Sequence, residues 1–326
     1  MKRNLLEILC CPKCSGNLSG PQPGEAEISE GDLLCDDCGA RYPVTNGIPR
    51  FVEADNYASS FGYQWNLFRK EQIDSHNGTT LSADRLWSET GWTPEELKGK
   101  WVLDVGCGAG RFLDASSMSE AEVVGIDISS AIGAAKENLQ GRENVHFIQA
   151  SIYDLPFKPG VFDYVYCIGV IQHTPDRDRS LRSIAEMVKP DGEIAVTIYP
   201  RKPWTKLFSK YWVRPITKRM KKETLLKLIQ GIMPAAFPLT DLLFRVPVLG
   251  KGFMFAIPVA NYVHDEQLSR DQRYAWAILD TFDMLSPAFD QPMTEEEARK
   301  PLREAGFEVS RTTLNGLNLV GKRRGI

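Results

Sequence analysis

Residues 102–112 read VLDVGCGAGRF, an apolar run that ends in three glycines at alternate positions. The run from Trp101 to Val105 is interrupted only by Asp104, which predicts a buried strand of a parallel sheet. The glycines allow a sharp turn and let the backbone approach a ligand without a Cβ in the way. The dinucleotide-binding fingerprint is G-x-G-x-x-G, whereas the spacing here is G-x-G-x-G. The stretch predicts an α/β fold with a ligand at this strand-to-helix turn.

Three further segments have the pattern expected of later strands in the same sheet. The second strand is predicted at VVGIDIS, residues 123–129, and it ends in Asp127. An acid at this place accepts hydrogen bonds from ribose hydroxyls in nucleotide-binding α/β folds, and Ile128 would then lie against an adenine ring. The other segments are VHFIQAS at residues 145–151, followed by DLPF and FDYVYC, and VKPDGEIAVT at residues 188–197.

Together these segments resemble the core motifs of class I S-adenosylmethionine-dependent methyltransferases, in the same order and at ordinary spacing. The resemblance implies a Rossmann-like, doubly wound, seven-stranded sheet whose glycine-rich loop curls around the methionine end of the cofactor. It implies cofactor contacts from Asp104, Gly106, Cys107, Gly108, Gly110, Asp127, Ile128, Ser151, Ile152 and Cys167. Ser151 departs from the family pattern, because related sequences often carry an acid there and a neutral hydroxyl accepts more weakly than a carboxylate.

Two cysteine pairs near the N-terminus form a second motif. Cys11, Cys14, Cys35 and Cys38 are spaced C-x2-C-x20-C-x2-C, the pattern of a four-cysteine zinc ribbon. Two disulfides are the alternative, but the apolar run after the first three residues is too short for a secretory signal. The zinc is expected to be structural, since four cysteines leave no open coordination position. Cys10 lies outside the spacing and is not expected to be a ligand.

The flanks of this motif, LLEIL at residues 5–9 and ARYPVTNGIP at residues 40–49, resemble the Trm112-type ribbon. In eukaryotes that domain is a separate activator of methyltransferases, and in many bacterial chains it is fused ahead of one. The expected organisation is a ribbon at residues 1–52, a helical cap at 53–98, the methyltransferase core at 99–200, a helical lid insertion at 201–292 and the end of the core at 293–326. The sequence does not decide whether the ribbon does more than bind zinc.

The cap contains SFGYQWNLF at residues 60–68, which resembles the segment before the core in ribbon-fused bacterial methyltransferases. Such helices commonly fold over the cofactor, so Tyr63, Gln64 and Trp65 are expected to shape the closed site. The alternative is a helix that only packs its aromatic face on the core.

The insertion begins with a basic, aromatic segment. Residues 201–222 hold nine lysines and arginines and no acid. Within them the spacing of Trp204, Phe208, Tyr211 and Trp212 predicts one face of an amphipathic helix. We expect this helix to bury its aromatic face against the site as a substrate lid, while its cations stay solvated or meet an anionic acceptor.

Composition is that of an ordinary globular chain of 326 residues, with 43% hydrophobic residues, 25% charged residues and a net charge of −3. No run approaches the roughly 18 apolar residues that a membrane span requires. Free cysteines at Cys107 and Cys167 beside the zinc ligands indicate a reducing compartment, so a cytoplasmic enzyme is expected.

The acceptor has to be inferred from the segment CIGVIQHTP, residues 167–175, which follows the fourth strand and faces the active site in open α/β sheets. Related small-molecule methyltransferases often carry two histidines where this chain has Gln172 and His173. Both are therefore candidate catalytic residues, and His173 is either a general base or a residue that only fixes the loop. The [Asn/Asp]-Pro-Pro-[Tyr/Phe] pattern of exocyclic-amine methylation is absent, which argues against methylation of DNA adenine or glutamine.

Three functions remain open. The first, which we favour, is methyl transfer to oxygen, nitrogen or carbon of a small-molecule acceptor in a biosynthetic pathway. The second is methylation of rRNA or tRNA, with the ribbon and the basic insertion binding RNA, but the chain is acidic overall and its positive charge is confined to one segment. The third is a cofactor-binding or regulatory protein without turnover. The sequence does not specify the acceptor, the pathway or the oligomeric state.

Overall fold

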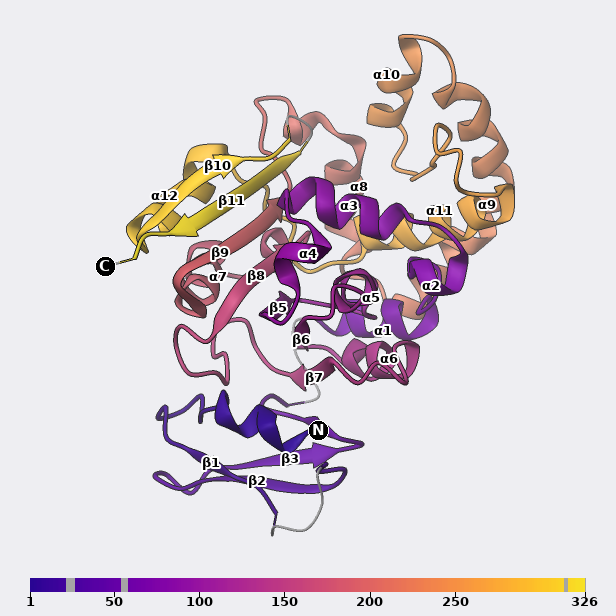
Figure 1. Ribbon diagram of the computed structural model, residues 1–326. Helices are drawn as coiled ribbons and strands as arrows, with labels where there is room; N and C mark the ends of the chain where they lie inside the picture. The colour runs from indigo at the N-terminus through magenta and orange to yellow at the C-terminus, as the bar shows by residue number, and fades with distance from the viewer. Residues whose placement is uncertain (22–26, 54–57, 314–315, 326) are drawn as a thin grey trace.

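The computed structural model describes residues 1–21, 27–53, 58–313 and 316–325. These residues form a seven-stranded sheet in the order β10-β11-β9-β8-β5-β6-β7, with helices on both faces (Figure 1). Its strands are β5 (Trp101–Val105), β6 (Glu122–Asp127), β7 (Val145–Gln149), β8 (Phe162–Ile168), β9 (Val188–Ile198), β10 (Phe307–Arg311) and β11 (Leu317–Arg323). Paired strands from β5 to β9 run parallel, and β11 is antiparallel to both β9 and β10. The predicted Rossmann-like α/β sheet is therefore confirmed.

The central strands are buried on both faces. On β5, Leu103 and Val105 belong to one cluster of buried side chains, whereas Val102 belongs to another. Side chains of α7 and α12 join the first cluster, and side chains of α3, α4, α5 and α6 join the second. Their bounds are α3 (Leu81–Thr90), α4 (Pro94–Leu97), α5 (Arg111–Ser117), α6 (Ala131–Asn138), α7 (Arg177–Glu186) and α12 (Glu295–Glu304). Burial on both faces explains why these strands read as nearly continuous apolar runs.

The N-terminal residues form a separate sheet beyond the β7 edge (Figure 1). In the described residues it has four strands and a preceding 3-10 helix: η1 (Arg3–Glu7), β1 (Leu18–Ser19), β2 (Gly31–Cys35), β3 (Arg41–Thr45) and β4 (Ile48–Pro49). The chain leaving β4 runs along β7, where the Phe51 N–H donates to the Gln149 carbonyl at 2.8 Å. The edge strand of the large sheet is thereby covered instead of being left open for pairing with another chain.

The N-terminal sheet also covers part of one face of the large sheet. The connection from β7 to β8, residues 150–161, contains no helix. Leu9 forms an isolated bridge with Phe157 of this connection, and both belong to the buried cluster that contains Leu103 and Val105. Apolar side chains of the N-terminal residues therefore contact the sheet where an ordinary parallel crossover would place a helix.

A helical insertion separates β9 from α12, as the sequence predicted. It comprises η3 (Thr205–Leu207), α8 (Ser209–Thr217), α9 (Lys222–Phe244), α10 (Leu249–Ala256) and α11 (Arg270–Leu285). Helix α11 packs against α8 and α9, whereas α10 contacts α9 and projects with it from the body of the molecule (Figure 1). No helix among the described residues combines the length and the apolar character needed to cross a membrane.

The single aromatic helix face predicted across residues 201–222 is wrong. Phe208 has an extended ψ of 127° and separates η3 from α8, so Trp204 precedes the helix and does not share its face. Tyr211 lines the cavity described below, whereas Trp212 is 68% exposed. A periodicity of 3.6 residues holds only within one unbroken helix, and this segment contains a break.

Several cations of the same segment are structural and not free, contrary to the expectation. Lys210 pairs with Asp290 at 2.7 Å, and the buried guanidinium of Arg214 lies 3.8 Å from the same carboxylate. Lys222 donates to the Ser286 carbonyl at 2.9 Å. These contacts tie α8 and the start of α9 to the chain that follows α11.

Candidate active site

A cavity of about 810 Å3 lies where the carboxyl ends of β5, β6, β8 and β9 meet α1 (Ser59–Leu67) and the insertion. In open α/β sheets, ligands bind at this edge where the strand order reverses. That point lies between β5 and β8, because the chain continues outward from β5 to β6 and from β8 to β9. No described residue before Ala58 lines the cavity, so the N-terminal sheet takes no part in its wall.

The loop after β5 forms one wall of the cavity. Gly106 and Gly108 have φ angles of 83° and 54°, in the left-handed region that favours glycine. A Cβ on Gly106 would lie 2.5 Å from the Val170 side chain, and one on Gly108 would lie 3.2 Å from Trp65 Nε1. Both positions therefore favour glycine by their φ angle and by their close neighbours.

Asp127 ends β6 and lines the cavity beside Ile128 and Ile152. One carboxylate oxygen accepts the Gly108 N–H at 2.9 Å, and the other accepts the N–H and hydroxyl of Ser129 at 2.8 and 2.6 Å. Burial raises the pKa of Asp127, and these hydrogen bonds oppose the rise. A carboxylate has about four acceptor sites, so one lone pair remains for a ligand hydroxyl.

The structure brings some of the predicted site residues together and leaves others outside. The cavity is lined by Gly106, Cys107, Gly108, Asp127, Ile128, Ile152 and His173. Five predicted residues, all in the described part of the chain, do not line it: Asp104, Gly110, Ser151, Cys167 and Gln172.

Packing explains why those five lie outside the cavity wall. Asp104 and Cys167 are 1% and 0% exposed inside the sheet, and burial raises the pKa of both. Gly110 caps the start of α5, where a Cβ would press on side chains of α6. The Ser151 hydroxyl accepts the N–H two residues on and closes a local turn. The Gln172 side chain is fully buried.

Helix α1 contributes to the cavity, but with different side chains from those expected. Phe61 and Trp65 line the cavity together, because residues four apart share one helix face. Tyr63 instead packs with the apolar core of the insertion, and Gln64 is fully buried without lining the cavity. Of the three residues expected here, only Trp65 lines the cavity.

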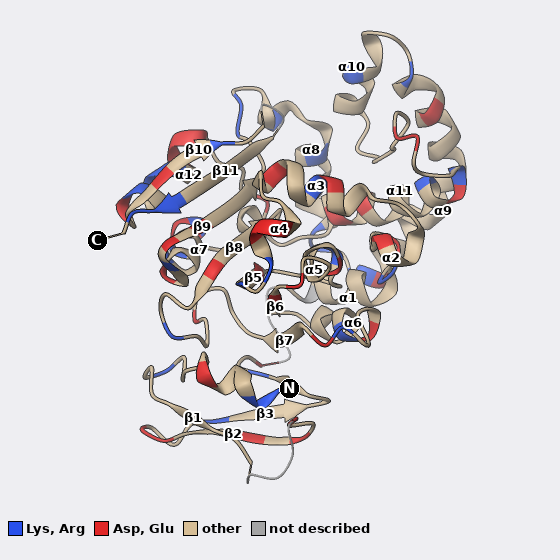
Figure 2. Ribbon diagram, in the orientation of Figure 1, with Lys and Arg blue, Asp and Glu red and all other residues tan. Residues whose placement is uncertain are grey.

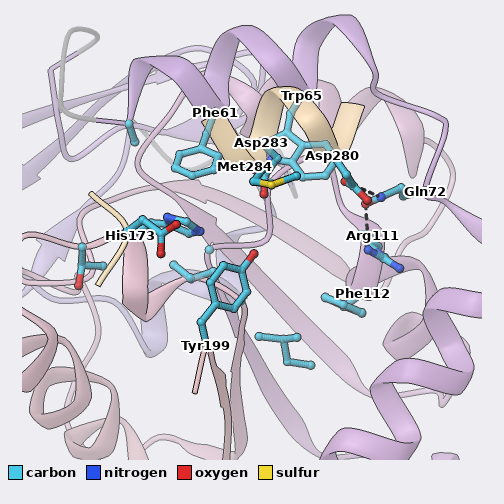
Figure 3. Close-up of a pocket in the computed structure, with 18 of the residues that line it drawn as sticks. Phe61, Trp65, Gln72, Arg111, Phe112, His173, Tyr199, Asp280, Asp283 and Met284 are labelled. Carbon is cyan, nitrogen blue, oxygen red and sulfur yellow. Dashed lines mark hydrogen bonds between the residues drawn. The ribbon is translucent and has the colours of Figure 1, made fainter. Parts of the chain in front are cut away.

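His173 ends a short 3-10 turn, η2 (Ile171–His173), that follows β8. Its Nδ1 lies 2.8 Å from the Phe289 carbonyl oxygen, which can only accept a hydrogen bond, so Nδ1 carries the proton. In the neutral ring, the lone pair is therefore on Nε2. Phe61 and Tyr199 pack against the imidazole, with ring centroids 5.2 and 5.5 Å away (Figure 3).

Helix α11 adds two carboxyl groups to the cavity, from Asp280 and Asp283 (Figure 3). Asp280 accepts from Gln72 Nε2 at 3.3 Å, and Gln72 Oε1 accepts from Arg111 at 2.9 Å. Burial and repulsion from Asp283 raise the pKa of Asp280 to about 7. Burial raises the pKa of Asp283 and lowers the pKa of His173. The electrostatic attraction between the two side chains opposes both shifts.

The four cysteines of the N-terminal pairs also converge. Their Sγ atoms all lie within 4.8 Å of one another, with Cys11 and Cys38 at 3.7 Å and Cys14 and Cys35 at 3.4 Å. Tetrahedral zinc with Zn–S bonds of about 2.3 Å separates its sulfurs by roughly 3.8 Å, whereas a disulfide holds them at about 2.05 Å. The Tyr42 hydroxyl lies 3.1 Å from Cys11 Sγ and can donate to a thiolate. The arrangement fits one metal ion held by all four sulfurs.

Comparison with protein families identifies both parts of the chain. Residues 103–196 match the family described as methyltransferase domain, and residues 2–47 match the family described as Trm112p-like protein. The chain joins a Trm112p-like domain to a methyltransferase domain. The methyltransferase match includes the glycine-rich loop, Asp127 and His173. The Trm112p-like match includes all four converging cysteines.

Curated relatives match less than half of the chain. The ubiquinone biosynthesis O-methyltransferase of Dechloromonas aromatica is 33% identical over 131 residues, which cover 39% of this chain and 56% of the relative. The enzyme of the same name from Pseudomonas syringae pv. tomato is 36% identical over 123 residues, covering 36% of this chain and 53% of the relative. The match thus spans about half the length of each relative.

Among solved structures, a complex that contains the Haloferax volcanii Trm112 methyltransferase activator is similar to this chain at 15% identity. Its TM-score is 0.42, and the similarity covers 79% of this chain and 97% of that one.

Two groups of cavity residues were not predicted from the sequence. Arg111 directly follows the third glycine of the motif, and its pKa is lowered to about 10 by burial and by Arg85. Asp280 and Asp283 interrupt the apolar run WAILDTFDML, residues 276–285, at a spacing of three. Two acids on one face of a largely apolar run were the available signal, because buried carboxylates need a functional or structural partner.

Proposed function

We propose that this chain transfers the methyl group of S-adenosylmethionine to a hydroxyl oxygen of a small aromatic acceptor, with His173 as the general base. The observation that carries the proposal is the fixed imidazole tautomer, which leaves the Nε2 lone pair of a cavity-lining ring available to take a proton. A cavity of about 810 Å3 falls in the usual range of small-molecule sites, roughly 300–1,000 Å3.

The residues of the methyltransferase domain fit this cofactor. The loop at Gly106 and Gly108 offers backbone without side chains, and Asp127 offers a spare carboxylate lone pair for a ribose hydroxyl. Ile128 and Ile152 also line the cavity and provide apolar surface for a purine ring. When bound, S-adenosylmethionine supplies an electrophilic methyl group on a sulfonium.

The protein contributes a proton acceptor and a closed, aromatic environment. His173 accepts the proton of the acceptor hydroxyl at Nε2, and the Asp283 carboxylate stabilises the imidazolium that results. Aromatic side chains around the acceptor space exclude water and favour a planar ring: Phe61, Phe112, Tyr199, Phe208, Tyr211 and Trp276. The names of the curated relatives, which are O-methyltransferases, support oxygen as the accepting atom.

An acceptor panel tests the proposal. The protein is incubated with methyl-labelled S-adenosylmethionine and pairs of aromatic compounds, each pair a phenol and its methyl ether. We expect S-adenosylhomocysteine release and a labelled ether with phenols, and neither with the ethers, because only a hydroxyl gives His173 a proton to remove. Labelling of amines alone, or equal turnover with the ethers, would contradict oxygen methylation.

The variant Asp127→Asn tests the proposed binding of the cofactor. It removes the negative charge of the side chain and keeps its size. We expect S-adenosylhomocysteine binding to weaken by about 1.5–3 kcal/mol, the range for a hydrogen bond to a charged group. Isothermal titration calorimetry measures the change. Asp154→Asn is the matched control, because that carboxylate pairs with Arg179 at the surface and does not line the cavity. Equal affinities of the two variants would place the ribose elsewhere.

Similarly, we propose that the cysteine cluster of the Trm112p-like domain holds one structural zinc ion. Four thiolates fill a tetrahedral shell and leave no position for a substrate or a catalytic water. The cluster also contributes nothing to the cavity wall among the described residues.

A further inference from the structure

The insertion exposes an unusual amount of apolar surface. Among the described residues, eleven of the fourteen exposed large hydrophobic side chains lie between positions 204 and 249. They are Trp204, Leu207, Phe208, Trp212, Ile216, Leu228, Ile232, Leu239, Leu242, Val248 and Leu249. We call these residues, which lie in or directly beside η3, α8, α9 and the start of α10, the insertion surface. Such a concentration marks an interaction site, since scattered single residues are the norm elsewhere.

Helix α9 shows most clearly that this exposure has a pattern. Leu228, Ile232, Leu239 and Leu242 are 45–69% exposed and lie within one narrow stripe, because their spacings of 4, 7 and 3 residues return to the same helix face. The opposite face is buried against α11 through residues such as Ile229. No charged residue occurs between positions 228 and 240. A surface helix normally places charges along its outer face, whereas residues 228–240 of α9 place none there.

The stretch of chain that carries this apolar surface is also rich in positive charge. Residues 204–256 contain ten lysines and arginines and only two acids, in a chain whose net charge is −3. Blue segments accordingly mark α8, α10 and the neighbouring turns (Figure 2). Within the described structure, five exposed lysines of this stretch form no ion pair: Lys206, Lys218, Lys221, Lys227 and Lys251. The remaining cations include Lys210 and Arg214, which are used internally.

We propose that the insertion surface docks on an anionic lipid bilayer, with its apolar side chains in the headgroup region and its lysines against the lipid phosphates. Exposed apolar residues combined with exposed lysines and with two exposed tryptophans, Trp204 and Trp212, are the signature of an interfacial segment that lies on a membrane without spanning it. The rings of Phe208 and Phe255 pack together with their centroids 4.2 Å apart. The residue before α8 is therefore in contact with α10. Trp204 and Phe208 also line the cavity, which places its rim beside the docked membrane.

Charge distinguishes this partner from two others. A second copy of the chain in a two-fold interface would bring two lysine-rich patches of the same charge together, which is repulsive. An RNA partner would satisfy the lysines, but aliphatic side chains such as Leu239 and Leu242 offer bases no stacking surface. An anionic bilayer satisfies the apolar and the cationic residues together.

Vesicle co-sedimentation tests the proposal with the full-length chain. Vesicles of phosphatidylcholine alone and of phosphatidylcholine with phosphatidylglycerol are compared at low and high salt. We expect binding to the anionic vesicles that weakens with salt, and little binding to the neutral ones. Leu239→Ser with Leu242→Ser, and separately Lys218→Ala with Lys221→Ala, are each expected to lower the partition coefficient about tenfold or more.

Matched controls keep the test interpretable. Leu67→Ser alters a leucine of similar exposure on α1, and Lys98→Ala alters an exposed lysine far along the chain from the insertion. Both are expected to bind like the parent, and circular dichroism verifies that every variant is folded. Absence of binding to anionic vesicles overturns the proposal. So does a dimer in sedimentation velocity that the leucine variant abolishes, or RNA retention that the lysine variant abolishes without vesicle binding by the parent.

Discussion

Cys11→Ser is expected to remove the metal and to lower the free energy of unfolding by more than about 4 kcal/mol, a size reached only by a few kinds of change, including loss of a metal site. The four sulfurs converge within 4.8 Å, so losing one opens the shell and leaves three thiolates to repel one another. Elemental analysis is expected to find about one zinc per chain in the parent and much less in the variant. Scanning calorimetry measures the loss of stability.

The unfolding is expected to reach the methyltransferase domain as well. Leu9 and Cys11 share one continuous buried cluster with Phe157 and the central strand β5. Loosening the Trm112p-like domain therefore exposes apolar surface of the large sheet and the edge of β7. A single transition at lower temperature is expected in place of early melting of a small domain before an unchanged large one.

Cys10→Ser is the matched control, since it makes the same chemical change at the next residue. Cys10 is also buried, but it stands outside the group of converging sulfurs. We expect the Cys10→Ser variant to keep its zinc. Its free energy of unfolding is expected to fall only by the modest contribution of one buried thiol. Full metal content in Cys11→Ser, or equal loss from both variants, would rule out the proposed ligand set.

Much of the fold and half of the site follow from local sequence. Three features lie within short segments of the chain: the apolar run before the glycines, the acid at Asp127 and the paired cysteines. Their spacing in the sequence therefore predicts their arrangement. The glycines at positions 106 and 108 need their φ angles wherever the rest of the chain lies. The large sheet and the cysteine cluster are accordingly confirmed.

The acceptor half of the cavity depends on contacts between distant segments. Asp283 reaches His173 only because α11 returns over the sheet after an insertion of more than seventy residues. The periodicity of residues 204–212 gave a wrong helix face, because nothing in the spacing signals the break at Phe208. Ser151 and Gln172 were selected by resemblance to family positions, whereas in the structure the Ser151 hydroxyl closes a local turn and the Gln172 side chain is fully buried outside the cavity wall.

His173→Gln is expected to lower kcat for methyl transfer by roughly 100- to 10,000-fold, the usual contribution of a general base. Glutamine retains a donor for the Phe289 carbonyl and fills similar space, but it cannot take a proton. Affinity for S-adenosylhomocysteine is expected to stay unchanged, because His173 lies on the acceptor side of the cavity. Single-turnover kinetics with a phenolic acceptor measures the rate, and calorimetry measures the affinity.

The pH dependence of the methyl-transfer rate shows whether His173 is a general base or a residue that only fixes the loop after β8. Burial lowers the pKa of His173 below its ordinary value of 6.5, so the ring is neutral and active at neutral pH. The rate is expected to fall as the pH drops through that lowered pKa, and this acidic limb is expected to vanish in His173→Gln. In Asp283→Asn the opposing carboxylate is gone, so the limb is expected to move to still lower pH while the rate also decreases.

His146→Gln provides the matched control for this series. His146 is a second buried histidine whose pKa is lowered by burial, but it pairs with Glu122 at 2.7 Å and does not line the cavity. Its replacement is expected to cost stability without changing the acidic limb or the rate of the folded protein. If His173→Gln kept both its rate and its acidic limb, His173 would be a positioning residue for the loop after β8. The proton would then have to leave through another group, and Asp280, with a pKa of about 7, is the next candidate in the cavity wall.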